Sequence, residues 1–175
     1  MNKEQAINVL RQQDNKGKYI FSNHDLHKFF KEDTLKTFNE GLKRLVNSKI
    51  LVRACRGVYI NEFAKSFDSY TIERIAQILR RGKYNYISLE SILSEYGIIS
   101  QIPIDRLTVM TTGRKGTYAT PYGVIEFIHT KRMITDILKG TLKVTERPLR
   151  IASKETALRD LKRVGRNLNL INLEE

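Results

Sequence analysis

The sequence has few of the residues that build disulfide frameworks, zinc sites or membrane spans. Among 175 residues there are three histidines and a single cysteine, Cys55. One cysteine excludes both an intramolecular disulfide and a zinc site that needs several cysteines. No stretch is long and apolar enough for a transmembrane helix, and the first residues lack the apolar stretch and cleavage site of a secretory signal. We therefore expect a cytoplasmic protein without a membrane partner.

Acidic residues are also scarce relative to basic ones. The chain has 19 Asp and Glu against 31 Lys and Arg, a formal net charge of +12. Residues 1–61 hold twelve basic and six acidic side chains, so the first third of the chain carries half of the excess. Such a charge favours phosphate-rich partners through long-range attraction and counterion release. Anionic membranes and acidic proteins attract basic surfaces as well, so charge alone does not choose between them.

The first sixty residues alternate between short helical and β-prone segments. Hydrophobic spacing and capping residues predict a helix, a strand and two further helices, over residues 2–13, 19–21, 25–30 and 34–48. We expect Ser22 or Asn23 to cap the second helix and Asp33 to cap the third. The third helix should bury one apolar stripe, which consists of Leu35, Phe38, Leu42, Leu45 and Val46.

The segment LVRACRGVYI (51–60) consists of two β-prone runs with a break between them, which predicts a β-hairpin. In the second strand, Val58 and Ile60 should face the core, opposite to Tyr59. In the first strand, alternation places three side chains on one face, namely Leu51, Arg53 and Cys55. Helix, strand, two helices and a hairpin, in this order, predict a winged helix-turn-helix DNA-binding domain over residues 1–62.

After a candidate boundary at 61–68, the chain mixes helices with strands. Helices are predicted over 69–82, within 84–100 and over 154–164, and Ser88 and Ser153 are the expected N-caps of the last two. Strands are predicted over residues 106–112, 117–123, 124–130 and 147–153. Consecutive strands without an intervening helix indicate a small, partly antiparallel sheet. The predicted fold class is α+β, a winged helix-turn-helix followed by a small mixed α/β domain over 68–175.

The polar face of the 34–48 helix is the best candidate for a contact surface. In a major groove it would offer hydrogen-bond donors to phosphates and base edges from Lys36, Thr37, Lys43, Arg44 and Asn47. Glu40, at the centre of this face, counts against close phosphates, although it could accept from a cytosine amine. The alternative is an ordinary solvated helix face.

Four further basic positions lie in predicted turns or hairpins. Arg53 and Arg56 would contact phosphates or the minor groove from the hairpin, or would merely discourage aggregation of an edge strand. The turn GRKG (113–116) could hold a phosphate through Arg114 or Lys115. For that turn we favour a simple exposed hairpin tip, because a glycine at each end is normal turn chemistry.

Catalytic and metal-binding patterns are weak. His24 and His27 are three residues apart, but no third ligand is evident. A magnesium-dependent nuclease could pair Asp105 with Glu126, yet the lysine that commonly follows such a glutamate by two positions is missing. Cys55 is expected to be a packed side chain. We therefore expect no enzyme, no metal and no cofactor.

Four segments, in order along the chain, carry a family resemblance: KRLVNSKILVRACRGVYI (43–60), YISLESILSEYGIIS (86–100), LTVMTTGRKGTYATPYGVIEFIHTK (107–131) and PLRIASKETALRDL (148–161). They resemble AbiEi-type antitoxins of the type IV toxin-antitoxin systems, which serve abortive infection and phage defence. The resemblance implies a transcriptional autorepressor that binds inverted repeats in its own promoter as double-stranded DNA. It also implies that the chain counteracts an AbiEii-like nucleotidyltransferase toxin, directly or indirectly.

In that family the DNA contacts come from the winged helix. The positions that match here are Lys36, Thr37, Lys43, Arg44, Asn47, Arg53 and Arg56. The C-terminal region, here 68–175, is associated with neutralising the toxin. The competing hypothesis is a protein-interaction module whose basic surface binds an acidic toxin directly.

Overall fold

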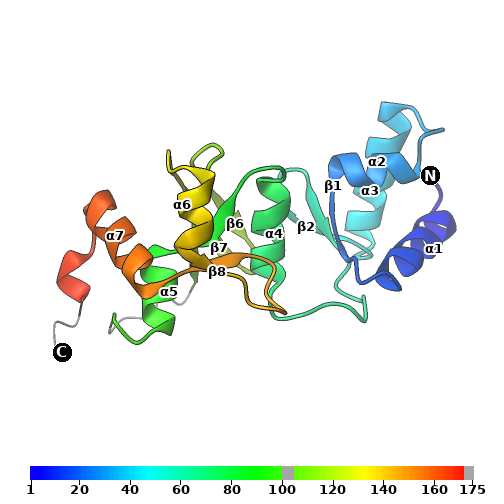
Figure 1. Ribbon diagram of the computed structural model, residues 1–175. Coiled ribbons are helices and arrows are strands. Elements are labelled where there is room, and N and C mark those ends of the chain that lie inside the picture. The colour runs from blue at the N-terminus through cyan, green and yellow to red at the C-terminus, as the bar shows by residue number, and fades with distance from the viewer. Residues whose placement is uncertain (100–104, 172–175) are drawn as a thin grey trace. The chain divides into compact units, whose positions relative to one another are not determined.

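The structure, a computed structural model, describes residues 1–99 and 105–171 and combines helices with two β-sheets (Figure 1). The α+β class predicted from the sequence is therefore confirmed. The chain divides into two compact units, Met1–Thr71 (unit 1) and Ile72–Glu175 (unit 2). Residue 100 of the predicted segment 84–100 and residues 101–104 and 172–175 lie outside the described part. Within the described ranges, no helix combines the length and the apolar character needed to cross a bilayer.

Unit 1 combines three helices with a three-stranded antiparallel sheet. Its elements are α1 (Lys3–Asp14), β1 (Ile20–Ser22), α2 (Asn23–Phe29), α3 (Leu35–Asn47), β2 (Val52–Cys55) and β3 (Val58–Ile60). The strand order is β1-β3-β2, so β3 pairs on both sides. All three helices contribute to one core with the sheet, formed by Ala6, Leu10, Phe21, Leu26, Phe38, Leu42, Leu45, Leu51 and Tyr59.

Side-chain caps set where the helices of unit 1 begin. Ser22, one of the two predicted candidates, forms a capping box at α2. Helix α3 is capped by Thr34, whose Oγ1 accepts a hydrogen bond from the Thr37 amide at 3.2 Å. The prediction of Asp33 as this cap is wrong. The Asp33 carboxylate instead accepts hydrogen bonds from the Met1 amino group.

The buried face of α3 is close to the predicted stripe but differs from it at the first turn. Leu35 is 69% exposed, so its predicted burial is wrong. It is the first helical residue, and the core begins one turn later. Gly41, inside the helix, faces the side chain of Met1, where a Cβ atom would lie 2.6 Å from the Met1 Cε. The buried residues of the helix are Phe38, Gly41, Leu42 and Leu45.

The segment that follows the hairpin packs on unit 1. The Asp14 carboxylate, at the end of α1, accepts hydrogen bonds from the Lys65 and Ser66 amides and from the Ser66 hydroxyl. The Tyr19 hydroxyl donates to Asp68 at 2.9 Å and lies 2.9 Å from the Thr71 hydroxyl. Residues 61–68, which were expected to form a boundary, are therefore held on unit 1 by hydrogen bonds.

Unit 2 is organised around a mixed sheet. Its elements are α4 (Thr71–Leu79), β4 (Asn85–Ile87), α5 (Leu89–Glu95), β5 (Arg106–Thr111), β6 (Gly116–Thr120), β7 (Gly123–His129), α6 (Ile134–Lys139), β8 (Thr141–Leu142), β9 (Arg150–Ala152), α7 (Lys154–Val164) and the 3-10 helix η1 (Leu168–Leu170). The strand order is β6-β7-β5-β4-β9-β8. The predicted partly antiparallel character is confirmed, with parallel pairing at β5–β7 and at β4–β9.

Three elements of unit 2, α6, β8 and η1, were not expected. They have six, two and three residues, which is shorter than the window in which hydrophobic periodicity can be recognised. Because β6 lies at the sheet edge and β7 is inserted beside β5, strands that follow one another in sequence are not all neighbours in the sheet. The sheet is also larger than expected, because β8 adds a strand beside β9.

The predicted N-caps of unit 2 behave differently from one another. Ser153 caps α7 through a hydrogen bond from the Thr156 amide. Ser88 precedes α5 but makes no side-chain cap. Its hydroxyl instead donates to the fully buried Asp160 at 2.8 Å, a carboxylate that also pairs with Arg132.

Candidate nucleic-acid interface

The polar face of α3 is open to solvent. Burial of the opposite face holds the helix against the core of unit 1, because residues three and four positions apart share one side of a helix. All five residues that were predicted to contact DNA from this helix are exposed, namely Lys36, Thr37, Lys43, Arg44 and Asn47. Thr37 is partly engaged, since its hydroxyl lies 3.0 Å from that of the cap residue Thr34.

A groove of about 420 Å³ runs between α3 and the hairpin of β2 and β3. Three of the predicted contact residues meet there, Lys43 and Asn47 from the helix and Arg53 from the hairpin. The apolar floor comes from residues of the core and its edge. The complete lining is Asn39, Leu42, Lys43, Val46, Asn47, Arg53 and Tyr59.

Arg44 lies on the other flank of the helix. It lines a second hollow, of about 360 Å³, together with Met1, Lys3 and Gly41. Asn47 borders both hollows. The structure therefore does not gather Arg44 with Lys43 in one recess, although the two residues are adjacent in sequence.

The hairpin presents its arginines outward. Arg53 is exposed and lies opposite Tyr59 in the strand register, and Leu51 is buried in the same core cluster as Tyr59. A register shift between Arg53 and Cys55 breaks the alternation of β2. Val58 and Ile60 are buried as predicted, but Tyr59 is buried too and joins the helical core. The prediction that Tyr59 faces away from the core is therefore wrong.

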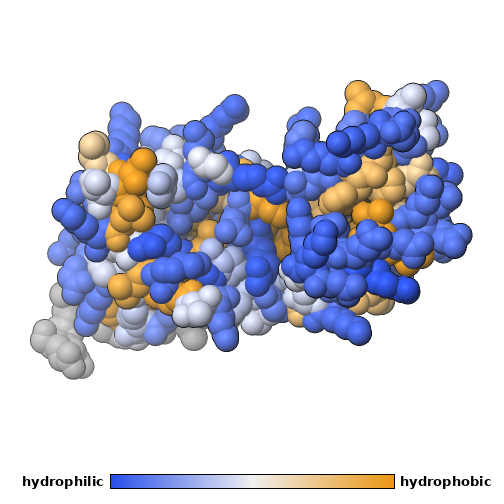
Figure 2. All heavy atoms as spheres, turned by 45° about the vertical axis from the view of Figure 1, so that its right-hand side comes forward, coloured by the Kyte–Doolittle hydropathy of each residue, from blue (hydrophilic) through white to orange (hydrophobic). Residues whose placement is uncertain are grey.

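The positive charges of this surface are not neutralised by neighbours. Within the residues that the structure describes, no ion pair involves the five cations of the surface, which are Lys36, Lys43, Arg44, Arg53 and Arg56. Glu40 is exposed on the same helix. Hydrophilic residues cover most of the surface in view, around separate hydrophobic patches (Figure 2). The cations therefore remain available to an anionic partner.

One groove residue, Asn39, was missed. It is exposed and lines the groove next to Lys43. Its position four residues before Lys43 is a signal that the sequence contained, because i and i+4 side chains are neighbours on a helix. The direction of the groove was not predictable, since it depends on where the hairpin packs.

The basic turn of unit 2 is not the hairpin tip that was predicted, because it joins β5 to β6, which are separated in the sheet by β7. Arg114 and Lys115 are exposed between β5 and β6. Two backbone groups of this turn have partners, since the Gly113 amide donates to Thr111 Oγ1 and the Arg114 carbonyl accepts from the Arg80 guanidinium. A contact between these two cations and a phosphate stays a prediction.

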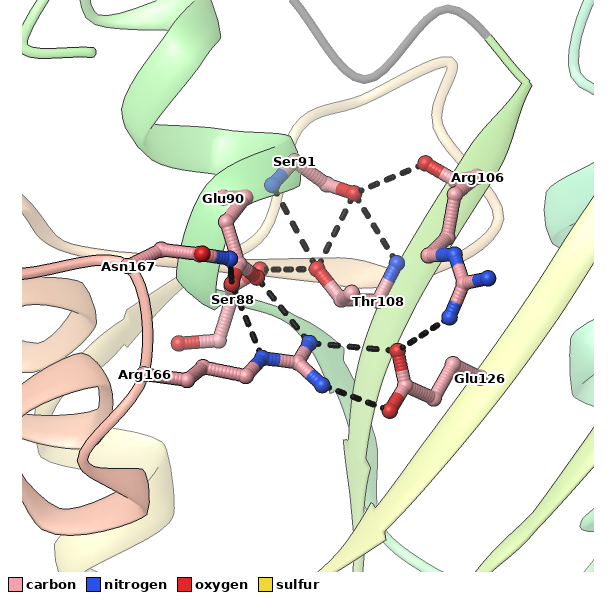
Figure 3. A network of polar contacts seen from close by, with 8 residues as sticks. All are labelled: Ser88, Glu90, Ser91, Arg106, Thr108, Glu126, Arg166 and Asn167. Atoms are coloured by element: carbon pink, nitrogen blue, oxygen red, sulfur yellow. Dashed lines mark hydrogen bonds and ion pairs between the residues drawn. The ribbon is translucent and has the colours of Figure 1, made fainter. Parts of the chain in front are cut away.

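A polar network in unit 2 occupies the glutamate of the nuclease alternative (Figure 3). The Arg166 guanidinium donates to Glu126 at 2.7 Å and 3.1 Å, and also to Glu90 at 2.8 Å and 3.1 Å. Arg106 makes a further ion pair with Glu126 at 3.1 Å. Both carboxylate oxygens of Glu126 are thus engaged by arginines, which place positive charge where a cation bound to Glu126 would lie.

This network lowers the pKa of Glu126. The largest cause is the hydrogen bonding from Arg166. Burial of the carboxylate opposes the shift, and the hydrogen bond from Arg106 adds to it. Asp105 is exposed. Across residues 1–99 and 105–171, no three acidic, histidine or cysteine side chains are grouped as a metal site requires. Burial raises the pKa of the Cys55 thiol, as it does for a packed side chain.

No family model matches the chain, and no curated protein matches it at a significant level.

Proposed function

We propose that the chain is a sequence-specific DNA-binding protein. In this proposal unit 1 is a winged helix domain, α3 enters the major groove, and the hairpin of β2 and β3 is the wing. The order of helices and strands supports the proposal, since it is that of winged helix-turn-helix domains. The observation that carries it is the groove in which Lys43, Asn47 and Arg53 converge, where neither cation has an ion-pair partner in the described part of the chain.

In the proposed complex, affinity and specificity come from different atoms. Lysine and arginine side chains neutralise phosphates and release counterions, which supplies most of the binding free energy. Base edges are read by side chains of α3, because a major groove admits a helix. Arg53 and Arg56 would then lie beside the phosphate backbone that flanks the groove.

Binding should depend steeply on salt and on the groove cations. We expect the logarithm of affinity for duplex DNA to fall linearly with the logarithm of salt, with a slope of about −0.9 per neutralised phosphate. Lys43→Ala and Arg53→Ala should each weaken binding and make the slope about one unit shallower. Fluorescence anisotropy titrations at several salt concentrations measure both quantities.

The matched control for these variants is Lys139→Ala. It removes one exposed lysine from α6 of unit 2 and so changes the net charge by the same amount. If all three variants weaken binding equally, the groove has no special role. If affinity does not depend on salt, nucleic acid is not the partner.

The wider role, an autorepressor and antitoxin that counteracts a nucleotidyltransferase toxin, is part of the proposal and rests on the AbiEi resemblance. One observation favours a direct protein contact as a second function. Four apolar side chains of unit 2 are unusually exposed in and around α6 and β8: Met133, Ile134, Leu138 and Leu142. Co-purification with the neighbouring gene product at high salt tests this, because an apolar contact survives salt that disrupts a purely ionic one.

A further inference from the structure

One row of side chains on α3 follows the groove. Leu35, Asn39, Lys43 and Asn47 succeed one another at intervals of four residues, so they form a single stripe along the helix surface. The last three line the groove, and Leu35 continues the stripe at the N-terminal end of the helix. We call these four residues the groove stripe.

The composition of the groove stripe is unusual for a solvated helix face. It contains two primary amides, one lysine and one leucine that is 69% exposed. A single exposed leucine needs no explanation in general. Here, however, the leucine occupies the first turn of the helix, and in helix-turn-helix complexes the N-terminal residues of the recognition helix contact base edges.

These side chains match the groups that A·T pairs display in the major groove. An asparagine amide fits adenine bidentately, because it accepts from N6 and donates to N7. An apolar side chain fits the 5-methyl group of thymine. Of the side chains that read guanine, arginine and lysine, the stripe contains only Lys43, and the one arginine of α3, Arg44, borders the opposite hollow.

We propose that α3 reads A·T base pairs, with Asn39 and Asn47 on adenines and Leu35 on a thymine methyl group. This inference rests on the proposed function, since it requires α3 to lie in the major groove. Lys43, between the two amides, supplies a charged contact within the same stripe. The preferred site should therefore have an A·T-rich centre.

The first experiment is selection from a randomised duplex library with the full chain. We expect the enriched sequences to share an A·T-rich core. In that core, replacing thymine by deoxyuracil removes only the methyl group and should lower wild-type affinity about fourfold, the value of one buried methyl. At the one thymine that Leu35 contacts, the same replacement should leave the affinity of the Leu35→Ala variant unchanged.

The amides are tested with 7-deazaadenine, which removes the N7 acceptor. Asn39→Ala should lower affinity for the selected site about tenfold. At the one adenine that Asn39 contacts, replacement by 7-deazaadenine should no longer change the affinity of this variant. Asn8→Ala is the matched control, because Asn8 is an exposed asparagine of α1. Circular dichroism verifies that the variants are folded, which is expected since both target side chains are exposed.

The two levels of the proposal fail differently. If the chain retains no duplex from the library at low salt, DNA binding itself is overturned. If it selects G·C-rich sites, or if deoxyuracil affects Leu35→Ala as strongly as the wild type, A·T readout by the groove stripe is overturned while DNA binding stands.

Discussion

Glu126 of unit 2 is held in its charged form by ion pairs with two arginines. Its side chain is 17% exposed, and its carboxylate accepts hydrogen bonds from Arg106 and Arg166. Both arginines lose a partner if the charge is removed. Glu126 also shares the Arg166 guanidinium with Glu90, so an ion-pair network joins segments of unit 2 that are distant in sequence.

We expect Glu126→Gln to lower the free energy of unfolding by about 2 kcal/mol at neutral pH, the value of charged hydrogen bonds. The folded pKa of Glu126 is depressed. Its contribution is therefore complete above the unfolded pKa, about 4.3, and is lost as the pH falls through the lower folded value. Urea unfolding at several pH values should show the difference between wild type and variant closing in acid.

Glu146→Gln is the control for this prediction, because Glu146 is an exposed glutamate of the same unit. It should change stability by less than about 0.5 kcal/mol. A gap between wild type and Glu126→Gln that stays constant down to strongly acidic pH would contradict the assignment of the depressed pKa to the two arginines.

At the scale of the element, the hairpin depends on the backbone of its turn. Gly57 has a φ of +78°, and a Cβ atom added there would meet nothing within 4 Å. Gly57→Ala should therefore cost about 1 kcal/mol through backbone strain alone, without a steric clash. Gly57→Asn should cost less, since asparagine tolerates this conformation better. Thermal unfolding of both variants measures the order, and equal losses would indicate that the turn is held by something other than the left-handed conformation.

At the scale of the whole molecule, the limits of unit 1 can be tested with fragments. The sequence suggested an end at residue 62, whereas the hydrogen bonds of Asp14 and Tyr19 reach Ser66, Asp68 and Thr71. We expect the fragment 1–71 to fold and to melt at a higher temperature than the fragment 1–61. Circular dichroism during heating compares them, and identical melting curves would show that the later contacts contribute nothing.

Much of the local structure was predictable because it depends on local chemistry. The helices of unit 1 follow hydrophobic spacing, and Ser22 and Ser153 cap the helices that they were expected to cap. The predicted burial of Leu35 was wrong because spacing identifies a face of a helix but not where along the helix the core begins. The strand faces of the hairpin were predicted only in part, because a bulge breaks the alternation of β2 and because all three residues of β3 are buried.

The sequence by itself determined the mixed helix and strand composition, the excess of positive charge and the polar face of α3, because each of these is a property of neighbouring residues. Tertiary structure decided which of those polar residues act together. Lys43 and Arg53 line the same groove, whereas Arg44 lines another hollow. Arg166 donates hydrogen bonds to Glu90 and Glu126, which lie in distant parts of the chain. Such encounters depend on how helices and strands pack, and packing is set by the whole core at once.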